Sequence, residues 1–131
     1  MLNIEIITPK EKILTSEAVE VILPTESGET GILKGHIPMI THLNAGALTI
    51  INKDKQEKFA VKGGYARLKA DKISVLTDDA LAFKSLDIAT IDSQIAEIER
   101  KLLELDNPNA GKSLKDELHY YNMLRSFANL S

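Results

Sequence analysis

The sequence predicts a mainly β, α+β protein. It should consist of an antiparallel β-sandwich of about nine or ten short strands over residues 1–86 and an αα-hairpin over residues 87–131. Up to residue 86, short apolar runs alternate with Gly, Pro, Asn and Asp, which is typical of strands joined by tight turns. From Asp87 onward, apolar residues recur every three or four positions, which is the period of a helix. The 131-residue length accommodates one small domain with an appendage.

The strands are predicted from alternation and from the turns between them. Leu2, Ile4 and Ile6 alternate with polar residues, as expected where one face of a strand is buried. Further strands are expected over residues 18–23, 30–33, 39–42, 47–51, 58–62, 65–69, 72–77 and 81–84. Turn residues separate them at 24–29, 44–46, 52–55, 63–64, 70–72 and 78–79. Strands so closely spaced leave no room for crossover helices, so the sheets should be mainly antiparallel.

The first helix is predicted from six apolar residues at spacings of 3, 4, 3, 4 and 3: Ile88, Ile91, Ile95, Ile98, Leu102 and Leu105. This spacing places them on one narrow stripe, and we expect the four from Ile91 to Leu102 to be buried against the second helix or the sandwich. Residues 106–112 should break the helix, because they include a proline, two asparagines and a glycine.

The second helix should start with Ser113 as its N-cap and fold back on the first. Its apolar residues at helical spacing are Leu114, Leu118, Tyr121, Leu124 and Ala128. The two helices would then form an αα-hairpin.

Charge and composition exclude several classes of function. The formal net charge is −3 and lies entirely in residues 87–131, since positive and negative residues are equal in number before residue 87. A nucleic-acid partner is therefore not expected. The chain has no cysteine, which removes disulfides and thiolate zinc sites. No run of ~18 apolar residues and no signal peptide are present, so we expect no direct membrane insertion.

The sequence also lacks complete versions of the common catalytic and cofactor-binding motifs. His36 and His42 lack the spacing of a metalloprotease pair, and no serine has a Gly-x-Ser-x-Gly context. The Gly111-Lys112-Ser113 segment lacks the first glycine of a phosphate-binding loop. We therefore expect no catalytic residue, no metal site and no cofactor. Two other functions stay open on these grounds: an adaptor that docks through its hairpin, and a small hydrolase that uses clustered carboxylates.

Residues 28–38 form the densest unusual feature, with three glycines and a proline. They are either two tight turns around a short strand or an exposed loop that presents Glu29 and His36 to a partner.

Two segments resemble the epsilon subunit of rotary F-type ATP synthases of the bacterial or plastid type. The first is residues 23–41, where Gly28-Glu29-Thr30-Gly31 leads into Gly35-His36-Ile37-Pro38. The second is residues 63–68, which begin Gly63-Gly64-Tyr65, followed by the strand over residues 73–80. The predicted sandwich and hairpin extend the resemblance over the whole chain.

The resemblance implies a non-catalytic central-stalk subunit that couples rotation of the membrane ring to the catalytic head. Its partners would be the gamma subunit and the loops of the membrane c-ring, contacted through Glu29, Gly31, Gly35 and His36. Glu29 would face the ring loops and His36 would lie at the gamma and ring contact. The protein would be peripheral, on the cytoplasmic face of a bacterial inner membrane or the stromal face of the thylakoid.

In this family the hairpin either folds on the sandwich or extends along gamma and blocks ATP hydrolysis by the catalytic alpha/beta head. Of the five cations in residues 87–131, the candidates for such contacts are Arg100, Lys101, Lys115 and Arg125. Two positions depart from the family. Lys34 stands where a proline is common, and Ile95 replaces the arginine of members that bind ATP on the hairpin.

Overall fold

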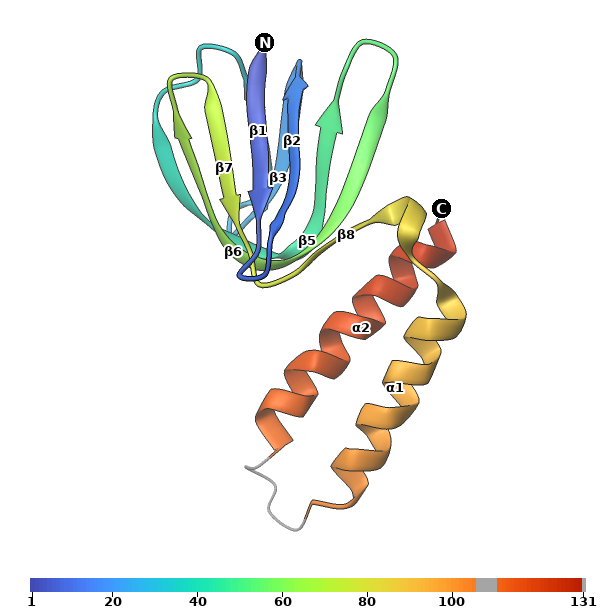
Figure 1. Cartoon of the computed structure of the whole chain (residues 1–131). Helices are drawn as coiled ribbons and strands as arrows, with labels where there is room; N and C mark the ends of the chain where they lie inside the picture. The colour runs from blue at the N-terminus through green and yellow to red at the C-terminus, as the bar shows by residue number, and fades with distance from the viewer. Residues whose placement is uncertain (106–110, 131) are drawn as a thin grey trace. The chain divides into compact units, whose positions relative to one another are not determined.

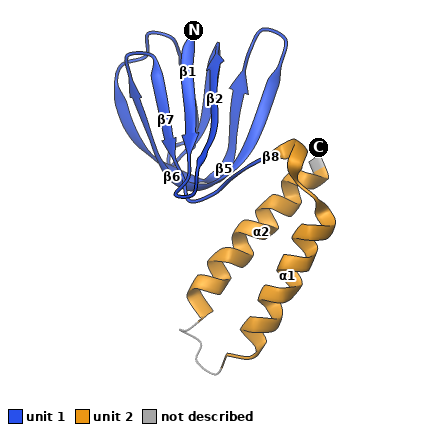
Figure 2. Ribbon diagram, viewed as in Figure 1, with its two compact units in different colours: residues 1–82 blue, residues 83–131 orange. Residues whose placement is uncertain are grey.

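Eight strands precede two α-helices in the computed structural model, which describes residues 1–105 and 111–130 (Figure 1). The strands are β1 (Leu2–Ile7), β2 (Lys12–Ala18), β3 (Glu20–Thr25), β4 (Gly28–Leu33), β5 (Met39–Ile51), β6 (Gln56–Lys69), β7 (Lys72–Leu76) and β8 (Ala80–Ala82). A 3-10 turn, η1 (Phe83–Ser85), leads to α1 (Ile88–Leu103) and α2 (Lys112–Leu130). The chain divides into two compact units, residues 1–82 and 83–131 (Figure 2).

The strands pair in the order β2-β1-β7-β6-β5-β3-β4, and β8 pairs with β6. All the pairs are antiparallel except β1 with β7, which is parallel. This confirms the predicted class, a mainly antiparallel β-sandwich followed by two helices. Alternate residues of β1, β3, β6 and β7 fill the core, and its largest fully buried side chains include Leu2, Ile4, Ile6, Leu23 and Ile73.

The strand count is eight because β5 and β6 each join two predicted strands. They pair continuously from Met39 with Leu68 to Ile51 with Gln56. The turns predicted at residues 44–46 and 63–64 are therefore wrong. Gly63 and Gly64 have φ of +87° and +109°, so they change the course of β6 without reversing the chain. Strand β2 was not predicted, since its mostly exposed and half-buried residues show no clean alternation.

The hairpin begins at Asp87, whose carboxylate accepts hydrogen bonds from the Ala89 N–H at 3.2 Å and the Thr90 hydroxyl at 2.8 Å. This is an N-cap, which satisfies a backbone N–H that the first turn of a helix leaves without a partner. Of the predicted stripe, Ile91, Ile95 and Ile98 are buried, which confirms its centre. Leu102 is half-buried, and the two ends of the stripe, Ile88 and Leu105, are exposed.

Helix α2 buries Leu124 and Ala128, as predicted, and also Tyr120, whereas the predicted Tyr121 is half-buried. Residues spaced by four follow one line along a helix, and this line is the one that becomes buried. Ser113 lies inside α2, which begins at Lys112, so its assignment as N-cap is wrong. Most of the predicted helix break, residues 106–110, lies outside the described residues.

Two further contacts tie the ends of the hairpin unit together. The Arg125 Nε lies 3.1 Å from the Asp92 Oδ1, which joins α2 to α1. The rings of Phe83 and Phe127 stack with their centroids 4.8 Å apart. Neither α1 nor α2, over the residues described, is apolar enough to cross a membrane.

Candidate partner-binding surface

The β3–β4 hairpin presents Glu29 on an edge strand. Its turn is closed by the Thr25 hydroxyl, which donates to the Gly28 carbonyl oxygen at 2.8 Å and lies 3.0 Å from the Thr30 hydroxyl. Gly28 has φ of +107°, a conformation that glycine adopts without steric cost. Glu29 follows, paired with Pro24 and exposed to solvent. The sequence thus folds locally into a turn held by hydrogen bonds, at which the carboxylates of Glu26 and Glu29 are both exposed.

Gly31 leaves room for a neighbouring carboxylate. It lies opposite Ile22 in the β3–β4 pair, and a Cβ placed on it would lie 2.7 Å from the Glu20 Oε2. A larger residue at this position would have to displace the Glu20 side chain. Because that carboxylate ends a flexible side chain, the structure sets only a weak requirement for glycine at Gly31.

The turn between β4 and β5 holds Gly35 and His36. The His36 N–H donates to the Leu33 carbonyl oxygen at 3.1 Å, and Gly35 has φ of +87°, as in a type II turn with glycine at its third position. Lys34 occupies the second position, where proline is common. The His36 Nδ1 lies 2.8 Å from the Ile37 carbonyl oxygen. Both Lys34 and Gly35 are exposed, and His36 is half-buried.

Asp71 fixes this turn from a distant part of the chain. Its Oδ1 accepts the Gly35 N–H at 2.8 Å, across 36 positions of sequence. The sequence analysis marked residues 70–72 only as a turn, because nothing local in the sequence reveals a partner so far away. Asp71 is thus a positioning residue for the Gly35-His36 turn.

The four predicted contact residues lie on one segment, Gly28 to His36, but they do not form a single cluster. Glu29 lies near the start of β4, and His36 lies beyond its end. A strand advances ~3.3 Å per residue, so the two side chains are separated along most of the strand. If both contact partners, they do so at different points of an extended surface.

An exposed apolar face lies on the outward side of β5, β6 and β7. Ile40, Tyr65 and Leu76 are 74%, 55% and 51% exposed. Tyr65 lies opposite Leu76 on one side and His42 on the other, and the His42 and Tyr65 rings meet edge to face at 5.0 Å. Large apolar side chains gathered on one face are typical of a protein–protein contact. The sequence analysis missed this face, although apolar residues at outward positions of alternating strands are a usable signal.

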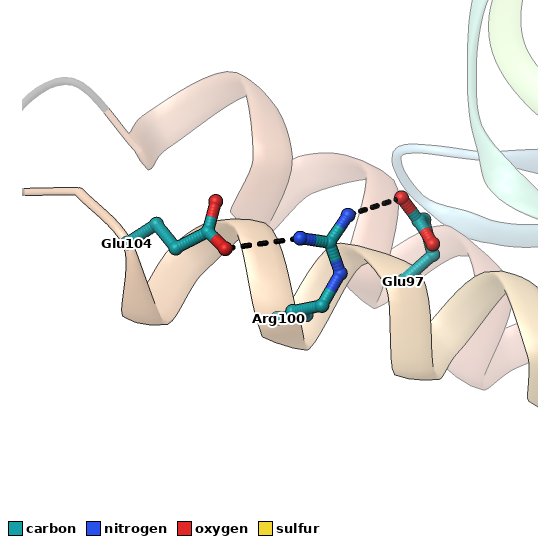
Figure 3. A network of polar contacts seen from close by, with 3 residues as sticks. All are labelled: Glu97, Arg100 and Glu104. Atoms are coloured by element: carbon teal, nitrogen blue, oxygen red, sulfur yellow. Dashed lines mark hydrogen bonds and ion pairs between the residues drawn. The ribbon is translucent and has the colours of Figure 1, made fainter.

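Two of the four candidate contact cations on the hairpin are already paired. Arg100 contacts the Glu97 carboxylate at 2.7 Å and the Glu104 carboxylate at 2.9 Å along α1 (Figure 3). The hydrogen bond that Arg100 donates to the Glu97 carboxylate lowers the pKa of Glu97 and raises the pKa of Arg100. Arg125 pairs with Asp92. Lys101 and Lys115 are exposed and form no ion pair with another described residue.

Metal-binding chemistry is not indicated. Across residues 1–105 and 111–130, no group of three or more His, Asp and Glu side chains could hold a metal ion. The features that stand out are surfaces: an exposed edge strand, a fixed turn, an apolar sheet face and two exposed lysines on a helical hairpin.

The fold is that of a β-sandwich followed by a two-helix hairpin, and its distinctive features are exposed surfaces. Residues 1–83 match the family described as ATP synthase, Delta/Epsilon chain, beta-sandwich domain. With the relatives below, this match shows that the chain belongs to the ATP synthase epsilon-chain family, which confirms the resemblance.

Relatives come from bacteria and chloroplasts. The chain is 32% identical to the ATP synthase epsilon chain of Myxococcus xanthus over 109 residues, which is 83% of this chain and 80% of the relative. It is 40% identical to the chloroplastic epsilon chain of Tetradesmus obliquus over 86 residues, or 66% of this chain and 63% of that relative. The match to the chloroplastic epsilon chain of Chlamydomonas reinhardtii covers 65% of the relative. The chain thus spans just under two thirds of these two chloroplastic relatives.

Solved structures share the fold at low sequence identity. A chain of the Euglena gracilis mitochondrial ATP synthase superposes with a TM-score of 0.76 at 20% identity, covering 95% of this chain and 79% of that one. A chain from the Tetrahymena thermophila mitochondrial ATP synthase, solved as its central stalk and c-ring, gives a TM-score of 0.61 at 14% identity. The match covers 97% of this chain and 96% of that one.

Proposed function

We propose that this chain is a non-catalytic subunit of the ATP synthase central stalk. It would transmit rotation of the membrane c-ring, through the gamma subunit, to the catalytic head. The observation that carries this proposal is the exposed apolar face of Ile40, Tyr65 and Leu76 on a sandwich of the epsilon-chain family. A sheet that exposes three large apolar side chains is suited to a lasting contact with another subunit.

The proposal divides the contacts between two surfaces. The apolar face binds gamma, and the segment from Glu29 to His36 meets gamma and the polar loops of the ring. Hydrogen bonds at both turns hold this segment in place without the partner, so little ordering entropy is lost on docking. The protein would be held at the membrane through its partners, on the cytoplasmic face in bacteria or the stromal face in plastids.

We expect Glu29→Lys and His36→Ala to weaken assembly without unfolding the chain. Glu29 is exposed on the edge strand β4 and His36 lies in the surface turn that follows it, and surface substitutions usually change the free energy of unfolding by less than ~0.5 kcal/mol. Losing a charged or hydrogen-bonding group at the edge of an interface should raise Kd about threefold to tenfold. The measurement is binding to a gamma–ring assembly depleted of this subunit, with thermal unfolding as the stability check.

Lys53→Glu is the matched control, because Lys53 is exposed in the loop between β5 and β6. Wild-type affinity in both test variants would contradict their assignment to the contact. A wild-type chain that fails to bind the assembly at all would contradict the stalk function itself.

The hairpin is proposed to restrain ATP hydrolysis by reaching the catalytic head. Lys101 and Lys115 are better suited to contact an acidic partner than Arg100 and Arg125, which the hairpin itself already engages. The restraint is therefore expected to be mild, since only three exposed lysines, Lys101, Lys112 and Lys115, remain among the described residues of a hairpin whose net charge is negative.

We expect the double substitution Lys101→Glu and Lys115→Glu to raise the ATPase rate of the reconstituted complex about twofold to fivefold, since exposed charge pairs contribute up to ~1 kcal/mol each. Steady-state ATPase assays in the same preparation provide the measurement. Lys84→Glu, on η1 outside the two helices, is the comparison variant. An unchanged rate in the double variant would rule out these lysines as inhibitory contacts.

A further inference from the structure

The turn that joins β6 to β7 is strained and held from two sides. Ala70 and Asp71 have φ of +50° and +62°, a left-handed conformation that side chains rarely adopt. The Asp71 carbonyl oxygen accepts the Asn3 N–H at 2.9 Å, and its carboxylate accepts the Gly35 N–H at 2.8 Å. These bonds offset the strain and fix the turn in place. Positive φ at both central residues is the geometry of a type I′ turn, which suits a two-residue hairpin such as this one.

The β6–β7 hairpin brings like charges opposite each other. The β6–β7 register places Lys69 directly opposite Lys72, and the next pair on that face is Arg67 with Ser74. Lys69, Lys72 and Arg67 are all exposed, whereas Leu68 and Ile73 between them point into the core. Opposed like charges destabilise an antiparallel pair. Three cations thus share one outward face of two adjacent strands.

The neighbouring carboxylate only partly neutralises this face. Glu5 lies 3.5 Å from the Lys72 ammonium and 3.3 Å from that of Lys12, and it accepts the Ser74 hydroxyl at 3.0 Å. The bond from Ser74 and then the one from Lys12 lower the pKa of Glu5, so it stays ionised and is shared by two lysines. Arg67 and Lys69 form no ion pair with any residue the structure describes.

A hollow lies over this face, and its lining is rich in hydrogen-bond donors. It is lined by Asn3, Arg67, Lys69, Ala70, Lys72 and Ser74. The Gly35–Asp71 hydrogen bond connects it to the Lys34-Gly35-His36 turn, so the basic face adjoins the segment already proposed to meet a partner.

We propose that this basic face, Arg67, Lys69 and Lys72 around the hollow, docks an acidic loop of a neighbouring subunit in the assembly. Carboxylates placed between Lys69 and Lys72 would remove the repulsion that the free chain carries. A protein loop fits better than a single small anion, because the cations extend over two residue pairs and continue into the adjacent turn. The inference rests on the proposed stalk function, because that function supplies the partner.

The test uses the single variant Lys69→Glu in the full chain. It replaces a like-charge pair by an opposite-charge pair, so the thermal midpoint of the free chain should be unchanged or higher. Its Kd for the depleted gamma–ring assembly should nevertheless rise about tenfold, because a repulsive charge now faces the acidic loop. A merely structural role would move stability and affinity together.

Three further measurements complete the test. The Kd of Lys69→Gln should lie between those of the wild type and Lys69→Glu. The Kd of Lys58→Glu, at the far end of β6, should equal that of the wild type. Wild-type affinity should weaken with added salt, and the slope should be shallower for Lys69→Glu.

A Lys69→Glu chain with wild-type Kd and salt slope would overturn the inference and leave the stalk function standing. Charge-dependent binding to anionic phospholipid vesicles, with no change in binding to the assembly, would also overturn it. Failure of the wild-type chain to bind the assembly would instead remove the stalk function and this inference together.

Discussion

Replacing Gly64 with alanine is expected to lower the free energy of unfolding of the sandwich by more than ~3 kcal/mol. Gly64 has φ of +109°, and a Cβ there would overlap the carbonyl oxygen of Leu76 and lie 3.0 Å from the Thr77 Cα. Both obstacles are backbone atoms, so no side chain can move aside. The substitution therefore forces β6 and β7 apart, and urea unfolding followed by circular dichroism measures the loss.

Gly28→Ala is the matched control for this prediction. Gly28 has a similar φ of +107°, but a Cβ there would meet nothing within 4 Å. This substitution should lower the free energy of unfolding by only about 1–2 kcal/mol, which is the cost of placing alanine in this backbone conformation. An equal decrease in the free energy of unfolding in the two variants would show that the close approach of Leu76 is not the reason why position 64 requires glycine.

Replacing Ile95 with aspartate is expected to unfold the hairpin and leave the sandwich folded. Ile95 is 6% exposed and lies in the buried stripe between Ile91 and Ile98. An unpaired carboxylate in such an apolar contact costs several kcal/mol, on the order of 3–5, which exceeds what a two-helix unit can absorb. Limited proteolysis should then cut within residues 88–130 while residues 1–82 stay intact.

Gln94→Asp supplies the comparison, because Gln94 is the exposed neighbour of Ile95 on α1. It carries the same new charge without burying it, so the hairpin should keep its protease resistance. Cleavage that is equally fast in both variants would mean that charge alone, and not burial, destabilises the helix.

The class of fold was predictable because the two parts have different periods. Alternation over residues 2–6 and the three-and-four spacing from Ile88 depend only on which face is buried, and a sequence displays that directly. Strand boundaries were less predictable. Gly63-Gly64 has the composition of a turn, but only its pairing with β5 keeps it in an extended strand. Local composition does not encode such a partner.

The parts of the candidate surface that depend on neighbouring residues in the sequence were predictable. Glycine spacing indicated the Gly35-His36 turn, whose geometry depends on the φ of one residue. The bond from Asp71 to that turn and the apolar face of Ile40, Tyr65 and Leu76 both require strands that meet only after folding. Asp71 and Gly35 are distant in sequence and share no pattern in a single chain, so their bond emerged only from the structure. The apolar face did leave a signal, in the apolar residues at outward positions of its strands.

The parallel pairing of β1 with β7 has a consequence for biosynthesis. β1 is an inner strand, and its residue Asn3 pairs with Lys72, which the ribosome adds 69 residues later. At ~5–20 residues per second, roughly 3–14 s pass between synthesis of the first strand and synthesis of its neighbour. During that time only β2 can cover one of its edges. The nascent chain thus carries an apolar strand with one open edge until most of the sandwich has been translated, a state in which chaperone binding or misassembly with another chain competes with folding.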